Sequence, residues 1–400
     1  MNTTRVNITA SVLRWSAALA IGTSVNMTNL RAQIFDSGSN GSLGDLVVTN
    51  NVSLVMPPDG VFHYKSITVQ NGANVYFSRN SANSAVYFLA TGDIFLDGSI
   101  HVDGGQGNGS LGGLAGPGGF NGGHPGFGVI KPGPGFGPGG GRAGTTDNST
   151  EGVAGGGGFL YRSGFGVSTN HGQPYGTPVL IPLIGGSGGG GSIQPNTSPG
   201  AGGGGGGGAI LIASSTKIIF GDGTITAGGG ARNAGPNGGS GGAIRLVAPK
   251  VTGTVRAYVN AEGDVASPGR VRIDTVDSSE MGVDIRPGVS ASRGNFLITG
   301  LSTNSPTLSI LRAATTTIAD GTVEPVSVLL PNGTSPSQTV VVQAKNFHSK
   351  VPINVVLTPE SGDPLVFPAE IDNTGNAPAT ATVSVTIPVN IPVTLNVWTR

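Results

Sequence analysis

The sequence predicts an all-β protein, in which a right-handed parallel β-solenoid with glycine-rich, polyglycine II-like inserts is followed by an immunoglobulin-like β-sandwich. A strand-and-turn segment of about twenty residues recurs at 85–105, 209–229 and 243–263, which is the period of a solenoid coil. Glycine makes up 72 of the 400 residues, and most of it lies between these copies. Near residue 283 the pattern changes to strand-like segments at the spacing of an antiparallel sandwich.

Residues 1–32 have the features of an export signal, and the alternative is an N-terminal strand or helix of the fold. Arg5 and Arg14 flank a polar start, residues 15–25 form a short apolar stretch, and Leu30-Arg31-Ala32 offers a cleavage site. The apolar stretch is too short to span a bilayer. We therefore expect a secreted or cell-surface protein with no membrane span.

Between residues 45 and 105 the sequence alternates short strands with turns. Asn-Gly and Asp-Gly pairs serve such turns because these residues tolerate positive φ at little cost. The β-branched and aromatic runs predict strands at 46–48, 52–56, 66–69, 74–77 and 86–89.

The repeat itself justifies the solenoid. The copies at 85–105 (AVYFLATGDIFLDGSIHVDGG) and 209–229 (AILIASSTKIIFGDGTITAGG) share an apolar run, a turn, a second apolar run, a glycine turn, an alternating strand and a Gly-Gly exit. A fourth copy begins at 271–274. Each coil buries its apolar residues against the next coils. We therefore expect the coils on either side of the largest insert, 105–208, to be neighbours.

The insert at 105–208 contains few apolar residues to offset its ordering. Fixing a backbone costs about 1 to 2 kcal/mol per residue, so the insert is either flexible or built of extended glycine segments that hydrogen-bond to one another. Interspersed aromatic residues favour the ordered bundle, because a flexible linker is typically rich in serine. The expected anchors to the solenoid are Phe120, Phe127, Phe136, Phe159, Tyr161, Phe165, Tyr175 and the apolar piece 178–184.

The last part of the chain predicts the sandwich. We assign residues 33–282 to the solenoid and 283–400 to the sandwich domain, whose size is ordinary for a domain. True immunoglobulin domains have two cysteines and a tryptophan in their core. The chain has no cysteine, so "immunoglobulin-like" describes architecture only. Strands are predicted at 295–301, 307–311, 326–330, 339–344, 353–357, 381–387 and 394–398.

Charge and composition exclude several functions. The formal net charge is +0 and the basic residues are scattered, so the sequence offers no basic patch for nucleic acid. The absence of cysteine excludes disulfides and thiol catalysis. The histidines lack metal-ligand spacing, and the Gly-x-Gly-x-x-Gly matches have no strand-to-helix context. We predict no catalytic residue, no cofactor and no metal.

Acidic and basic residues on the repeats are the candidates for an enzyme. A glycan-cleaving enzyme needs paired carboxylates or an acid beside a base. Asp97 and Asp222 each precede a glycine, where aspartate has an ordinary turn function. We interpret the basic and acidic residues of the last coil as an interface salt bridge. The full set of candidates is Asp97 with Asp103, Asp222, and the cluster of Arg245, Arg270, Arg272 and Asp274.

Several stretches resemble a group of uncharacterised, secreted glycine-rich bacterial proteins. They are PPDGVFHYKSITV, PLIGGS followed by glycines, GGAILIA, SGGAIRLVAP, and the ending with VVVQAKNF, VPINVVLTP, ATATVSV and PVTLNVWTR. The resemblance covers most of the chain and implies no established activity. A looser likeness, in composition and architecture, is to phage tail-fibre adhesins, whose polyglycine II sandwiches present loops to a receptor.

These observations favour a secreted or cell-surface structural or adhesive protein without catalysis, with a polysaccharide or a cell-surface component as its partner. The alternatives are a polysaccharide lyase or glycoside hydrolase on a β-helix, and an ice- or mineral-binding surface. Aromatic faces suit sugar rings, so the candidate ligand contacts are the insert residues His124, Tyr161, His171 and Tyr175. The sequence leaves the ligand and the oligomeric state open.

Export makes the first testable prediction. Because residues 5–32 have signal character, the mature chain is expected to begin at or near Gln33. The intact mass of protein recovered from the culture medium measures this start. A mass that retains Met1 contradicts the prediction.

Overall fold

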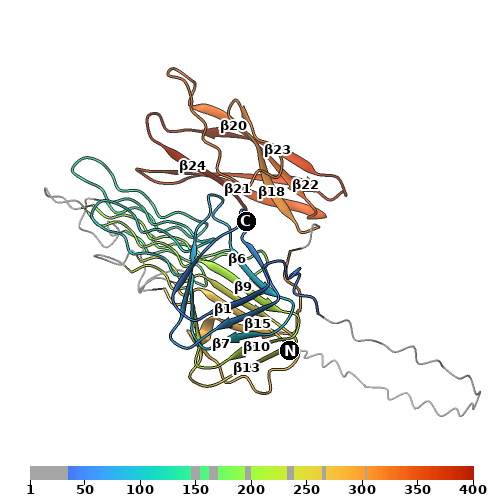
Figure 1. Cartoon of the computed structure of the whole chain (residues 1–400). Helices are drawn as coiled ribbons and strands as arrows, with labels where there is room; N and C mark the ends of the chain where they lie inside the picture. Colours follow the sequence, from blue (N-terminus) through green and yellow to red (C-terminus); the bar gives the residue numbers. More distant parts are fainter. Residues whose placement is uncertain are drawn as a thin grey trace, which may run out of the picture. The chain divides into compact units, whose positions relative to one another are not determined.

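The computed structural model describes residues 35–145, 154–161, 170–193, 200–231, 238–263, 267–301 and 304–400, and Phe35–Arg400 form one compact unit. The predicted leader at 1–32 lies outside the described residues. The described chain is all-β, with parallel and antiparallel sheets, one short 3₁₀ helix at Gly288–Ser290 and no α-helix (Figure 1). None of its helices has the length and apolar character that a membrane crossing requires.

Residues 45–294 build three parallel sheets. The first sheet contains β1 (Asp45–Val48), β4 (Ser66–Val69), β7 (Ile94–Leu96), β10 (Lys217–Phe220) and β13 (Lys250–Gly253). The second sheet contains β2 (Val52–Val55), β5 (Asn74–Ser78), β8 (Ser99–His101), β11 (Thr224–Thr226), β14 (Tyr258–Asn260) and β16 (Asp284–Arg286). The third sheet contains β3 (Val61–Tyr64), β6 (Val86–Ala90), β9 (Ala209–Ser214), β12 (Ala243–Val247), β15 (Arg270–Asp274) and β17 (Ala291–Gly294).

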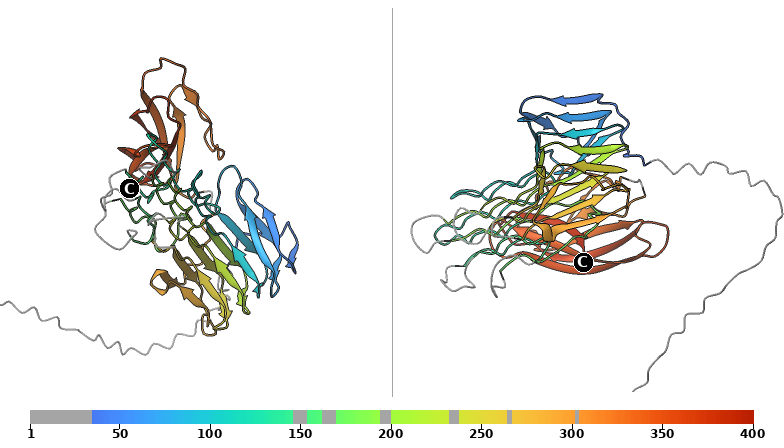
Figure 2. Two further views of the ribbon diagram at one scale, coloured as in Figure 1. Left: turned by 90° about the vertical axis from the view of Figure 1, so that its left-hand side faces the viewer. Right: turned by 90° about the horizontal axis from the view of Figure 1, so that it is seen from below.

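From β1 to β15 the chain visits the first, second and third sheet in turn and then starts the next circuit, whereas β16 and β17 extend the second and third sheets only. The right view of Figure 2 shows these strands following one another in chain order, from blue to yellow. In the third sheet Ile210 of β9 pairs with Val86 of β6 on one side and with Ile244 of β12 on the other. The sequence copies therefore align strand upon strand, and the circuits on either side of the insert are neighbours as expected, because β9 pairs with β6.

Alternating side chains of the three sheets meet in one apolar core. Each strand is too short to be stable alone, and stacking neighbouring circuits buries a continuous apolar interior. Full burial of one such side chain contributes about 1.5 to 3 kcal/mol. Representative core residues with no exposed surface are Ile67, Ile94, Ile218, Ile225 and Val251.

The third sheet is covered on its outer face as well, because all residues of β9 and β12 are buried. Phe35, Leu183 and Leu297 pack against this outer face. Residues 295–301 were predicted as a strand of the sandwich and form no strand. Their apolar character serves to cover the sheet, which a local sequence pattern does not distinguish from strand formation.

The C-terminal region forms two antiparallel sheets that share one apolar core. One sheet contains β18 (Thr307–Ala313), β19 (Thr316–Thr317), β20 (Ser337–Lys345) and β23 (Ala379–Thr386); the other contains β21 (Ser349–Pro359), β22 (Leu365–Asn373) and β24 (Val393–Thr399). The predicted strand at 326–330 is absent, and β22 was not predicted. Parallel pairing continues through β16 and β17 to Gly294, beyond the predicted boundary at residue 283.

Candidate functional site

The glycine-rich segments all leave the sheets at the same place, between a strand of the second sheet and a strand of the third. Residues 102–208 join β8 to β9, residues 227–242 join β11 to β12, and residues 261–269 join β14 to β15. Because these strands stack on one another, the glycine segments that extend them also come together. We call the described parts of these segments the glycine bundle.

Backbone hydrogen bonds connect glycine segments that are far apart in sequence. The N–H of Gly203 donates to the carbonyl of Gly123 at 3.0 Å, and the N–H of Gly189 donates to the carbonyl of Gly204 at 2.9 Å. Residues 202–208 are buried throughout. Buried backbone groups need such partners, so the described glycine segments form the ordered bundle and not the flexible alternative.

A side chain has no room in the glycine run 202–208. A Cβ built at any of its seven glycines comes closer than 3.0 Å to backbone atoms of a neighbouring segment; at Gly205 these atoms belong to Leu114 and Ala115. Backbone atoms of a bonded bundle move only if the segments separate. Glycine is therefore required by close approach and not by local conformation.

The insert is anchored on the third sheet by a small aromatic cluster. The rings of Phe159 and Tyr175 lie 4.6 Å apart, and the guanidinium of Arg270 lies 5.5 Å from the centre of the Phe159 ring. Phe159 packs with Leu180 against Ala209 and Ala243 of the third sheet. The predicted anchors Phe159, Tyr175 and 178–184 therefore contact the sheets. Of the others, Phe127 and Tyr161 are exposed, and Phe165 lies outside the described residues.

Tyr175, which was predicted both as an anchor and as a ligand contact, packs inside the insert. Its hydroxyl donates to the carbonyl of Gly185 at 2.6 Å and accepts from the Ser187 hydroxyl at 3.0 Å. Burial raises the pKa of Tyr175 well above its ordinary value, with smaller opposing effects from Ser187 and Arg270. The hydroxyl thus stays protonated and fixes the turn before residue 185.

The four predicted contact residues do not form one site. His171 is only 8% exposed, and its Nδ1 accepts from the N–H of Gly156 at 3.2 Å. His124 is half-buried in the bundle, whereas Tyr161 is 49% exposed and donates its N–H to the Ser267 hydroxyl at 3.1 Å. Tyr161 is therefore the most accessible of the four. The expectation of exposed side chains was wrong for His171, because the glycine segments close around it.

The aspartates of the repeats occupy structural positions. Asp97 accepts the N–H of Asp222 at 2.8 Å in the stacked turns. Asp103 lies at the other end of β8, where it accepts from the Thr226 hydroxyl and from the Gly228 N–H, each at 2.5 Å. Asp97 and Asp103, the candidate pair of carboxylates, lie at opposite ends of β8. The backbone from Ser99 to Asp103 alone spans about 13 Å at roughly 3.3 Å per residue. The two carboxylates of a glycosidase lie only roughly 5 to 9.5 Å apart. This arrangement supports the turn interpretation of Asp97 and Asp222.

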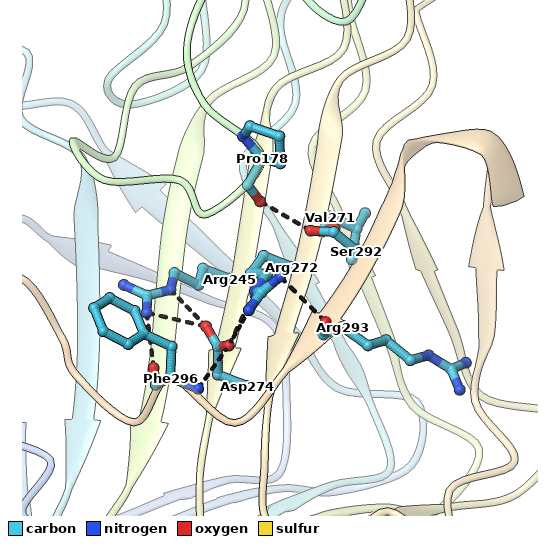
Figure 3. A network of polar contacts seen from close by, with 8 residues as sticks. All are labelled: Pro178, Arg245, Val271, Arg272, Asp274, Ser292, Arg293 and Phe296. Atoms are coloured by element: carbon cyan, nitrogen blue, oxygen red, sulfur yellow. Dashed lines mark hydrogen bonds and ion pairs between the residues drawn. The ribbon is translucent and has the colours of Figure 1, made fainter. Parts of the chain in front are cut away.

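Asp274 is the centre of a buried ionic network on the third sheet (Figure 3). Its carboxylate accepts from Arg245 Nη2 at 3.0 Å and from Arg272 Nε at 2.9 Å, and it also accepts the Phe296 N–H at 3.1 Å. Arg245 and Asp274 have no exposed side-chain surface. The predicted interface salt bridge therefore joins β12 and β15 to the covering segment 295–301.

Arg270 does not belong to this network, although the sequence placed it there. Its side chain donates to the carbonyl of Tyr175 at 3.1 Å and lies over Phe159. Arg270 and Asp274 share a face of β15, but they lie at opposite ends of the strand, about 13 Å apart at roughly 3.3 Å per residue. Among the described residues no cluster of three or more acidic or histidine side chains could hold a metal ion.

The outer face of the second sheet carries a pair of rings that was not predicted from the sequence. On this face the rings of Tyr76 and His101 stack with centroids 4.9 Å apart. Their paired position in the register follows from the repeat, because both occupy the polar phase of adjacent strands. Aligning the copies rung by rung and inspecting outward positions would have found them.

Comparison of the chain with protein-family models, with curated proteins and with solved structures found no match.

The glycine bundle predicts a large effect of one methyl group. Gly205→Ala is expected to lower the free energy of unfolding by about 3 kcal/mol or more, several times the roughly 1 kcal/mol of an average substitution. The matched control is Gly375→Ala, because a Cβ at Gly375 meets nothing within 4 Å. Denaturant unfolding measures both variants. Equal stability of the two variants contradicts the tightly packed bundle.

The buried network makes a further prediction. Asp274→Ala leaves two arginines without their carboxylate and is expected to cost about 3 to 5 kcal/mol of stability. The exposed pair of Lys350 and Glu370 is the control, since Glu370→Ala removes a surface ion pair of 3.8 Å and is expected to cost less than about 1 kcal/mol. If Asp274→Ala unfolds at the same denaturant concentration as the parent, the network contributes nothing to stability.

Proposed function

We propose that this chain is a secreted or cell-surface structural and adhesive protein that acts without catalysis. Its architecture in this proposal is a right-handed parallel β-solenoid that carries a polyglycine II-like bundle, followed by an immunoglobulin-like β-sandwich. The observation that carries the proposal is the glycine bundle, whose backbone-to-backbone hydrogen bonds make a long insert rigid with little apolar burial. Such an insert holds its own loops in fixed positions.

The topology supports the finer description of the fold. Strands that recur in three parallel sheets with a period of three are the pattern of a solenoid. Extended glycine segments with bonds between neighbours match the chemistry of polyproline II-type chains, which form no internal hydrogen bonds. The two C-terminal antiparallel sheets with one shared core resemble a sandwich.

A hairpin of the insert presents apolar side chains to solvent. Phe127 and Ile130 exchange backbone hydrogen bonds of 3.0 and 2.9 Å, and Gly126 donates to the carbonyl of Ser192 at 2.9 Å. Phe127, Val129 and Ile130 are all largely exposed. Exposed apolar groups mark interaction sites. Because the hairpin is held by a rigid insert, less entropy is lost when it binds a partner. We place the adhesive contact at this hairpin.

A polysaccharide lyase or glycoside hydrolase is less well supported. Asp97, Asp222 and Asp274 each accept hydrogen bonds from groups of the fold, which gives them structural roles. Asp97→Asn and Asp222→Asn should therefore leave any glycan-related behaviour unchanged. Loss of a measurable polysaccharide cleavage in either variant, with the fold intact by circular dichroism, favours the enzyme.

The adhesive proposal is tested with a triple variant of the hairpin, Phe127→Ser, Val129→Ser and Ile130→Ser. Because these side chains are exposed, the variant is expected to keep the thermal stability of the parent and to lose most of its adhesion to cells. The control is Val55→Ser on β2, which removes an equally exposed apolar group outside the insert. Undiminished adhesion of the triple variant contradicts the assignment of the contact to the hairpin. Point variants are preferable to removal of residues 107–206, because that deletion uncovers Ala209 and Ala243 by removing Phe159 and Leu180.

A further inference from the structure

We infer that the outer face of the second sheet is a binding site for a neutral, hydroxyl-rich polysaccharide, separate from the hairpin of the insert. The site extends over β5, β8, β11 and β14. These strands are hydrogen-bonded neighbours, so three steps of about 4.8 Å give a strip roughly 14 Å long. The ligand class rests on the proposed adhesive function, whereas the face itself is defined by the geometry that follows.

One end of the strip holds two aromatic rings in a fixed arrangement. Tyr76 stacks on His101 with an interplanar angle of 15°, and Tyr76 remains 44% exposed. Both nitrogens of His101 are engaged, Nδ1 with the Thr226 hydroxyl at 2.9 Å and Nε2 with Asn74 Oδ1 at 3.0 Å. The tyrosine ring is therefore held in place before a ligand arrives, which reduces the entropy lost on binding.

The other end holds a second tyrosine, Tyr258, which is half-buried. The Arg286 guanidinium lies 5.1 Å from the centre of the Tyr258 ring and also bonds to Asp284 at 2.7 Å. Tyr258 of β14 pairs with Thr224 of β11. Its strand is the third neighbour of β5, which carries Tyr76. Two aromatic platforms at this separation suit a chain of several sugar rings better than a single small molecule.

Hydroxyl groups lie between the two tyrosines, and an amide lies beside Tyr258 on β14. Ser99 and Thr224 share a hydrogen bond of 2.8 Å, and Asn260 occupies the position next to Thr226 in the register. Such neutral groups both donate and accept, as sugar hydroxyls do.

The charges on the face disfavour an anionic ligand. Asp103 and Glu262 are exposed at the same edge of the strip, where each follows a strand of the second sheet. Arg286 is already paired with Asp284. Nucleic acids and acidic polysaccharides require cationic partners for their charges, and the exposed carboxylates would repel them. The combination of aromatic rings, neutral polar groups and acceptor carboxylates thus favours a neutral glycan.

The test is electrophoresis of the full chain in native gels that contain a polysaccharide. The neutral probes are mixed-linkage β-glucan, xyloglucan, galactomannan and dextran, and the acidic probe is polygalacturonate. We expect retardation by at least one neutral probe and none by polygalacturonate. Tyr76→Ala and Tyr258→Ala are each expected to raise the Kd for the retarding probe about tenfold, and Tyr76→Phe is expected to keep the parent value.

The matched control is Phe95→Ala, an exposed aromatic residue on the outer face of the first sheet. It is expected to leave the retardation unchanged. Only variants that keep the thermal unfolding midpoint of the parent enter the comparison. Tyr258→Ala decides the result if Tyr76→Ala alone fails to fold. The inference is overturned by the absence of retardation in every neutral gel, by retardation in polygalacturonate only, or by an equal loss in Phe95→Ala.

The outcomes separate this site from the proposed adhesive function. A chain that adheres to cells through the hairpin but is not retarded by any neutral polysaccharide contradicts the glycan site alone. A chain that is retarded, and loses retardation in the tyrosine variants, but does not adhere to cells contradicts the adhesive hairpin alone.

Discussion

The structure depends on the continuation of one hydrogen-bond ladder from the sheets into the glycine segments. Val102 donates to the carbonyl of Thr226 at the end of β8, and two residues later Gly104 donates to the carbonyl of Gly228, both at 2.8 Å. The apolar core fixes the spacing of the circuits, and this spacing is then imposed on chains that have almost no apolar side chains of their own. The sheets therefore act as the template on which the bundle is ordered, and the absence of Cβ atoms permits its close packing.

Much of the fold could be predicted because the repeat encodes register. Aligning Ala85, Ala209 and Ala243 by sequence predicts the pairing of β6, β9 and β12, and the strands have this register in the structure. What covers the third sheet could not be predicted in this way. Phe35 and Leu297 reach it from distant segments, and only the tertiary structure decides whether a short apolar run pairs as a strand or packs over a sheet.

In the candidate site, too, features set by local sequence could be predicted and features set by tertiary structure could not. The turn function of Asp97 depends on the glycine beside it, which the sequence displays directly. The burial of His171 depends on glycine segments whose three-dimensional arrangement has no periodic signal, so it was wrongly expected at the surface. Tyr76 and Tyr258 were overlooked because each is one residue in a short strand, and their relation appears only when the strands are stacked.

The central claim is that the glycine bundle is as ordered as the sheets that carry it, and amide hydrogen exchange tests this most directly. Residues 202–208 are buried, and the amides of residues 202, 203 and 205–208 donate to neighbouring segments, so these amides should exchange as slowly as those of β9, which follows them in the chain. Exchange of residues 202–208 at the rate of an unprotected peptide, while the amides of β9 remain protected, would contradict the account.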